Sequence, residues 1–185
     1  MFHMASSYNT AKQIYADFGV DTEKAMEVLD KIPLSMHCWQ GDDVGGFETP
    51  DATLGCGGIQ ATGNFPGKAR SVDELRADID EALKYIPGKT RINLHAIYGE
   101  FFGKKVDRDE ISFDNFKGWT DWCKDRKMGI DFNPTFFSHP LAADGFTLSS
   151  ADKSVRKFWI AHAIACRKIA EKIGKALSDT VITNF

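Results

Sequence analysis

Hydrophobic residues in the first 33 positions recur at the spacing of amphipathic helices. The pattern over residues 11–18 predicts a helix that ends near Gly19, a residue type common after helices. Asp21 is placed to cap a second helix, and Pro33 ends it. We therefore expect an N-terminal helical segment, residues 1–33.

From residue 34 onward, short apolar runs alternate with longer stretches of helical periodicity. The short runs predict strands over residues 34–39, 91–98, 129–132 and 180–185. The stretches between them predict three helices, because their hydrophobic residues return at helical spacing. Parallel strands need such crossovers, so this order predicts an α/β fold class.

Capping and breaking residues mark the ends of the three predicted helices. Ser71-Val-Asp-Glu74 has the spacing of a capping box, and Ser112 can cap the next helix. Pro87-Gly88, Gly129 and Gly174 are expected to end the helices.

Two architectures fit four strands joined by three crossover helices. One is an open, doubly wound sheet, and the other is part of a (β/α)₈ barrel. The connection over residues 41–70 is long and rich in glycine. A loop of this kind is typical of a functional segment or of a contact between subunits.

The composition is that of a globular protein rather than of a disordered or fibrous one. The 185 residues are 43% hydrophobic and 26% charged, with a formal net charge of -3. Without a clustered basic surface, a nucleic-acid partner and a membrane surface are both disfavoured. No apolar run reaches the ~18 residues that span a bilayer, and the N-terminus resembles no secretory signal. We therefore expect a cytoplasmic protein.

The four cysteines, Cys38, Cys56, Cys123 and Cys166, are scattered along the chain and form no Cys-x-x-Cys pair. This spacing excludes a zinc ribbon and a thioredoxin-type dithiol. We expect reduced, mostly buried thiols, in keeping with the cytosol.

Two glycine-rich stretches have only a superficial likeness to nucleotide-binding motifs. Residues 63–69 lack the spacing and the Ser or Thr of a phosphate-binding loop. Residues 55–58 lack the third glycine of a dinucleotide fingerprint. An unrelated nucleotide-binding enzyme on an open sheet is the alternative that these failed motifs disfavour.

Each of the first three predicted strands ends in polar or aromatic residues that a hydrophobic core does not need. These residues are His37 and Trp39, then His95 and Tyr98, then Asp131 and Asn133. Ligands of α/β folds bind at the carboxyl ends of strands, so the residues predict a binding site with an acid–base histidine. His162 lies on the apolar face of a helix, where we expect core or surface packing rather than a functional role. No compact cluster has the spacing of metal ligands, and no metal ligand is assigned.

Several strings at these positions resemble the L-rhamnose isomerase family. They are SMHCWQGDD (35–43), GIQATGN (58–64), PGKAR (66–70), NLHAIY (93–98), DFNP (131–134), SHPL (138–141) and ADGFTL (143–148). The resemblance implies a (β/α)₈ barrel that interconverts L-rhamnose and L-rhamnulose as a cytoplasmic homotetramer. It also implies two divalent metals, typically Mn²⁺, which would polarise the sugar oxygens as Lewis acids.

The resemblance further implies roles for the residues at the strand ends. His95 would be a catalytic residue that assists ring opening, through a hydrogen bond to the ring oxygen or to the anomeric hydroxyl. Trp39 and Tyr98 would form apolar walls against the sugar. Asp131 and Asn133 would belong to the substrate site as indirect support, behind the residues that touch the sugar. The loop over residues 41–70 would lie against the active site of a neighbouring subunit.

The metal ligands of the family are expected on later strands than those found here. A (β/α)₈ barrel typically has ~250 residues. We therefore interpret residues 34–185 as the first half of the barrel, with four strands and three connecting helices, inactive alone. The alternative is a stand-alone half-barrel that oligomerises or binds sugar without catalysis.

Overall fold

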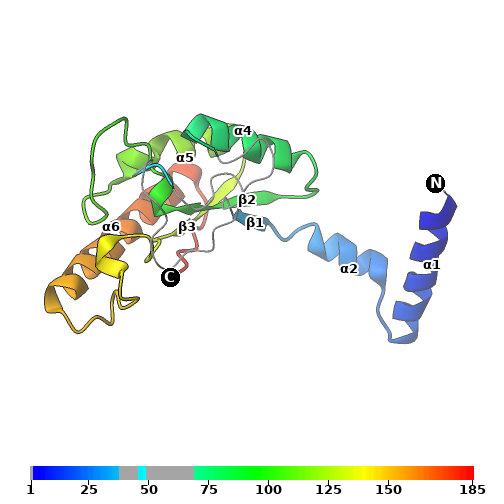
Figure 1. Ribbon diagram of the computed structural model, residues 1–185. Helices are drawn as coiled ribbons and strands as arrows, with labels where there is room; N and C mark the ends of the chain where they lie inside the picture. The colour runs from blue at the N-terminus through cyan, green and yellow to red at the C-terminus, as the bar shows by residue number, and fades with distance from the viewer. Residues whose placement is uncertain (1, 38–45, 49–68) are drawn as a thin grey trace. The chain divides into compact units, whose positions relative to one another are not determined.

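The computed structural model describes residues 2–37, 46–48 and 69–185 (Figure 1). Trp39, Cys38, Cys56 and most of the connection over residues 41–70 lie outside the described residues. The chain divides into two compact units. One comprises residues 1–34 and 87–89, and the other comprises residues 35–86 and 90–185.

The first unit contains two helices, α1 (Phe2–Asp17) and α2 (Thr22–Leu29). Gly19 has a left-handed φ of 76° just after α1, as the sequence predicts. Asp21 caps α2, because its carboxylate accepts hydrogen bonds from the N–H groups two and three residues further on, at 3.1 and 3.2 Å. Both predicted helices are therefore confirmed, although α2 ends before Pro33.

A small sheet with the strand order β1 (Leu34–His37), β2 (Thr90–His95), β3 (Gly129–Asn133) carries the second unit. β2 and β3 are parallel, and their register pairs Asn93 with Asp131 and His95 with Asn133. The connecting helices are α4 (Val72–Leu83), α5 (Lys117–Asp125) and α6 (Lys153–Leu177). The predicted α/β class is confirmed.

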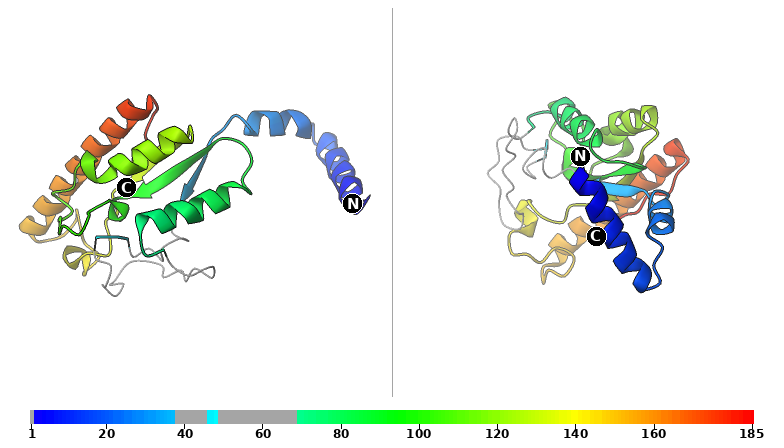
Figure 2. Two further views of the ribbon diagram at one scale, coloured as in Figure 1. Left: turned by 90° about the horizontal axis from the view of Figure 1, so that it is seen from above. Right: turned by 90° about the vertical axis from the view of Figure 1, so that its right-hand side faces the viewer.

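The two faces of the sheet differ in chemistry because side chains alternate along each strand. One face is apolar and fully buried, and it consists of Ile92, Leu94, Ile130 and Phe132. Figure 1 and the right-hand view of Figure 2 show α4, α5 and α6 following one another along one side of the sheet. The opposite face is polar, and it carries Arg91, Asn93, His95, Asp131 and Asn133.

The second strand is shorter than predicted. β2 ends at His95, and residues Ala96–Tyr98 form a 3₁₀ turn. The carbonyl groups of this turn have partners outside the sheet. Ile97 O accepts from Phe47 N at 2.8 Å, and Tyr98 O accepts from Trp119 Nε1 at 2.8 Å. These contacts replace strand pairing, so Tyr98 follows the strand instead of ending it.

Two glycines that were expected to end helices do not do so. α5 ends at Asp125, and Lys127 takes the left-handed conformation, so that Gly129 is already the first residue of β3. A side chain at Gly129 would collide with the Arg91 guanidinium. Gly174 lies inside α6, where a Cβ would come within 2.9 Å of the Asp179 carbonyl oxygen. Close approach of another group, not helix termination, accounts for both glycines.

The capping predictions hold in part. Ser71 Oγ accepts from Glu74 N at 3.2 Å, but the Glu74 carboxylate accepts from Arg70 N, one residue before the cap. Ser112 does form a full capping box, with Asn115 as the partner. The helix after it begins as a 3₁₀ turn, Phe113–Phe116, before α5.

The fourth predicted strand, residues 180–185, is reduced to a single parallel bridge between Phe132 and Thr183. Phe132 N donates to Ile182 O at 2.9 Å, which places this segment beside β3. The Ile182 N–H, however, donates to the side chain of Asp131 at 3.0 Å rather than to a β3 carbonyl group. Among the described residues, the pairing of this segment with β3 is limited to the one bridge.

Candidate functional site

The last residues of the three strands, His37, His95 and Asn133, meet at one edge of the sheet. The ring centroids of His37 and His95 are 6.1 Å apart, and His95 is in register with Asn133. This is the edge at which the sequence predicted a ligand site, because carboxyl ends of strands carry the ligands in α/β folds. The structure thus brings three strand ends together.

His95 lies at the centre of this edge and is 0% exposed. Its Nδ1 is 3.2 Å from Thr135 Oγ1, and its ring contacts Tyr98 and, edge-on, Phe137, with centroids 5.5 and 6.2 Å apart. Burial lowers the pKa of His95 to about 3, and electrostatic interaction with the neighbouring His37 and Arg108 adds to the effect. The imidazole is therefore neutral at physiological pH.

Tyr98 and Trp39 were predicted to form apolar walls for a substrate. Tyr98 is fully buried, with its ring 5.9 Å from that of Phe47. Trp39 lies outside the described residues. Both predicted roles stay predictions.

The Asp131 carboxylate is held entirely by protein groups. It accepts from Ser35 Oγ at 2.7 Å, from Arg91 Nη2 at 2.9 Å and from Ile182 N at 3.0 Å. Burial alone would raise the pKa of Asp131, but hydrogen bonds from Arg91, Ser35 and Ile182 outweigh it and leave the pKa below its ordinary value. Asp131 therefore ties strands together on the polar face, and its support of a substrate stays a prediction.

Asn133 acts on the loop that follows β3. Its Oδ1 accepts from Thr135 N at 2.7 Å, and its backbone carbonyl lies 3.2 Å from Thr135 Oγ1. Thr135 has a φ of 60°, a left-handed conformation that is unusual for a β-branched residue. Asn133 thus shapes the turn beside His95, and direct contact with a substrate stays a prediction.

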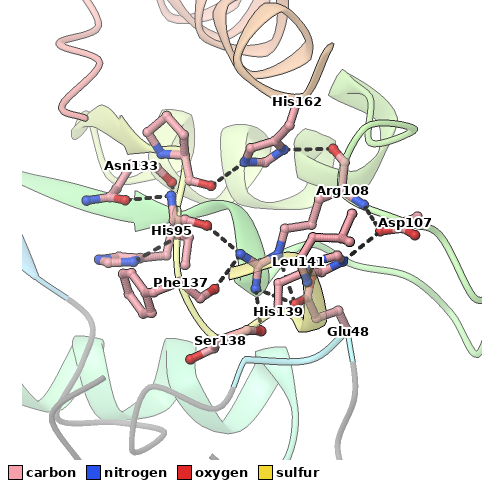
Figure 3. A network of polar contacts seen from close by, with 12 residues as sticks. Glu48, His95, Asp107, Arg108, Asn133, Phe137, Ser138, His139, Leu141 and His162 are labelled. Atoms are coloured by element: carbon pink, nitrogen blue, oxygen red, sulfur yellow. Dashed lines mark hydrogen bonds and ion pairs between the residues drawn. The ribbon is translucent and has the colours of Figure 1, made fainter. Parts of the chain in front are cut away.

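Arg108 is a buried member of this site that no sequence pattern singles out. Figure 3 shows its guanidinium between Glu48 and the backbone of the loop after β3. It pairs with Glu48 at 2.6 Å and donates to the carbonyl groups of Thr135, Phe137 and Ser138. Its side chain is 1% exposed, so these contacts form a closed network.

His162 of α6 is 0% exposed, so of the two kinds of packing expected for it, core and surface, the structure shows the core. Its Nδ1 is 2.8 Å from Arg108 O, and its Nε2 is 2.5 Å from Pro134 O (Figure 3). Burial lowers the pKa of His162. This histidine joins the two loops that surround the site.

A second link between the same loops involves Asp107 and His139. His139 Nδ1 accepts from Leu141 N at 3.1 Å, which leaves Nε2 to donate to Asp107 Oδ1 at 3.1 Å. The loop after β2 therefore holds the loop after β3 at several points. Both loops lie at the edge where His95 is found.

Within residues 2–37, 46–48 and 69–185, no three His, Cys, Asp or Glu side chains come together as a set of metal ligands. The described part of the chain therefore does not fit the pair of metals that the resemblance implies.

Cys123 and Cys166 are buried free thiols, as predicted, whereas Cys38 and Cys56 lie outside the described residues. Among the helices described here, none has the length and apolar character needed to cross a membrane.

The comparison with known proteins confirms the family resemblance. A family model of L-rhamnose isomerase (RhaA) matches residues 2–185. The chain is 52% identical over 183 residues to L-rhamnose isomerase of Rhodopirellula baltica, which covers 99% of this chain and 42% of that protein. It is 52% identical over 182 residues to L-rhamnose isomerase of Escherichia coli (strain K12), covering 98% and 43%. The chain thus spans less than half the length of these relatives, and it belongs to the L-rhamnose isomerase family.

Proposed function

We propose that this chain supplies the sugar-facing part of an isomerase that interconverts L-rhamnose and L-rhamnulose. One observation carries the proposal: a neutral, buried histidine, His95, lies at the carboxyl edge of the sheet in a member of the L-rhamnose isomerase family. The relatives named above are L-rhamnose isomerases over more than twice this length. The isomerisation itself is therefore proposed for the whole protein, and the chain alone is proposed to be inactive.

We propose that the second unit is the first half of a (β/α)₈ barrel. The strand order β1-β2-β3, continued by the bridge from Phe132 to Thr183, never reverses direction among the described strands. A doubly wound sheet reverses its order at a switch point, with helices on both faces. Helices on one side and polar side chains on the other favour the barrel, whose inner face would hold the sugar.

In this proposal, His95 forms a hydrogen bond with the sugar during ring opening. Its low pKa excludes a standing positive charge, so the neutral imidazole acts by hydrogen bonding. Phe137 is partly exposed and lies edge-on to His95, whereas His95 itself is fully buried. Contact with a sugar therefore requires the Phe137 ring, or another covering group, to move aside.

The family also suggests the setting in which the chain works. We propose two divalent metals, Mn²⁺ by preference, held by ligands outside the described residues, where they would polarise the sugar oxygens. We further propose a homotetramer in the cytoplasm, with no nucleic-acid or membrane partner. The hydrogen bond proposed between His95 and the sugar does not involve the metals.

A chimera tests the proposed function. Residues 1–185 replace the matching part of Escherichia coli L-rhamnose isomerase, and conversion of L-rhamnose to L-rhamnulose is measured with Mn²⁺ present. The parent enzyme is the control, and circular dichroism verifies folding. We expect the chimera to convert L-rhamnose. A folded chimera without this activity would contradict the proposal.

A further inference from the structure

We propose that Arg108 is a positioning residue for His95. It holds the backbone after β3 so that Thr135 Oγ1 accepts a hydrogen bond from His95 Nδ1–H. The inference rests on the proposed function, since it adds a role to the histidine of that site, but its test measures the imidazole directly.

Thr135 has an unusual backbone conformation. Its φ of 60° places a β-branched residue in the left-handed region, which sterics disfavour. Thr135 is 0% exposed, its N–H donates to Asn133 Oδ1 at 2.7 Å, and its carbonyl accepts from Arg108 Nη1. A disfavoured conformation persists where surrounding contacts fix it, and here they do so from both sides.

Thr135 Oγ1 carries a single hydrogen. A backbone carbonyl only accepts, so the 3.2 Å contact with Asn133 O uses this hydrogen. Oγ1 can then only accept from His95 Nδ1, also 3.2 Å away. The proton of the neutral imidazole therefore lies on Nδ1, and Nε2 is an acceptor.

This assignment distinguishes between the two sugar contacts considered for His95. An Nε2 that accepts can bind the anomeric hydroxyl, which donates a hydrogen. It cannot donate to the ring oxygen, which has no hydrogen. The tautomer therefore favours the anomeric hydroxyl as the atom that His95 contacts.

Arg108 has no donor left for a ligand. Its five N–H groups go to the Glu48 carboxylate and to the carbonyl groups of Thr135, Phe137 and Ser138. Ser138, like Thr135, has a positive φ, of 53°. Arg108 therefore acts through the loop and not on the substrate.

Nitrogen NMR of the ¹⁵N-labelled 185-residue chain tests the inference. Long-range ¹H–¹⁵N correlations distinguish a protonated from an unprotonated ring nitrogen, and His95→Asn identifies the signals. We expect the His95 signals to show a proton on Nδ1. We expect Thr135→Val to lose this single-tautomer pattern and Thr135→Ser, which keeps the hydroxyl, to retain it.

The same spectra test Arg108. We expect Arg108→Lys to change the His95 pattern in the direction of Thr135→Val, because a lysine cannot hold three carbonyl groups and Glu48 together. Arg126→Lys, in the exposed pair with Asp80, is the matched control and should change nothing. If Arg108→Lys does not fold, Glu48→Gln, which weakens the same guanidinium contact, takes its place.

The outcomes separate this inference from the proposed function. An unchanged Nδ1–H pattern in the folded Arg108 and Thr135 variants overturns the inference, as does a wild-type proton on Nε2. Neither result affects the activity of the chimera. An inactive chimera with the expected His95 spectra overturns the proposed function alone.

Discussion

Arg91 and Asp131 form an ion pair across β2 and β3, with Nη2 and Oδ1 2.9 Å apart and side chains 13% and 5% exposed. The pair lies on the polar face of the sheet. Arg91 also pairs with Asp179, and Asp131 also binds Ser35 and Ile182. These two residues therefore join all three strands to the segment that follows α6, below the edge that carries His95.

Removal of the Asp131 charge should be costly, because the largely buried Arg91 keeps only the more exposed Asp179 as an acidic partner, and Ser35 and Ile182 N lose their charged acceptor. We expect Asp131→Asn to lower the free energy of unfolding by about 3 kcal/mol. Asp80→Asn, in the exposed pair with Arg126, should cost under about 1 kcal/mol. Urea unfolding of both variants measures the difference, and equal losses would contradict the assigned role.

Stability should fall in mild acid because of His95. Its pKa is about 3 in the folded chain, against 6.5 for an ordinary histidine, so below 6.5 the unfolded chain binds a proton that the folded chain excludes. The contribution of His95 to the free energy of unfolding is therefore fully present above pH 6.5 and is lost progressively as the pH falls below this value. Between about pH 7 and about pH 5, His95 should account for a loss of about 2 kcal/mol.

His95→Asn is the matched variant for this measurement, because it keeps an N–H near the position of Nδ1. Urea unfolding at several pH values should show a shallower pH dependence for the variant. His162, whose pKa is also lowered by burial, leaves a residual slope in both proteins. Identical slopes for the variant and the unmodified protein would show that His95 binds a proton equally well in the folded and the unfolded chain.

Local sequence signals predicted the features that depend on near neighbours. Asp21 and Ser112 cap their helices as expected, since each bonds to N–H groups within three residues. The alternation along residues 91–98 predicted β2, which the structure ends at His95, and polar residues at the strand ends predicted the edge where His95 lies. Each of these predictions depends on spacing within one element.

Features that depend on distant partners were not predictable in this way. Arg108 follows two lysines, at 104 and 105, a pattern typical of a solvated loop, yet its partners lie 27 to 60 residues away. Thr135 carries no signal for a positive φ, which glycine usually supplies. Gly174 was interpreted as a helix end, because the approach of Asp179 cannot be inferred from helical periodicity.

Gly174→Ala should destabilise the protein although alanine favours helices by about 1 kcal/mol. Its Cβ would lie 2.9 Å from Asp179 O, a backbone atom with little freedom to move. We expect a net loss of about 1–2 kcal/mol in thermal or urea unfolding. Lys157→Ala, at an exposed position of α6, should change stability by less than about 0.5 kcal/mol. A more stable Gly174→Ala variant would contradict the contact.

Cys123 and Cys166 should resist thiol reagents in the folded protein. Both are 0% exposed, and burial raises the pKa of each thiol to about 12, so almost no thiolate is present at neutral pH. Peptide mapping after alkylation should find both unlabelled without urea and labelled with it. Rapid labelling of either in native buffer would show that its packing is wrong.

The isomerisation rate of the chimera with His95→Ala shows whether His95 acts on the sugar. The variant should fold like the unmodified chimera and lose L-rhamnose isomerisation by about 10²-fold or more, the usual contribution of an acid–base or hydrogen-bonding side chain. Turnover of L-rhamnose at the rate of the unmodified chimera would contradict the assignment of His95 to the sugar site.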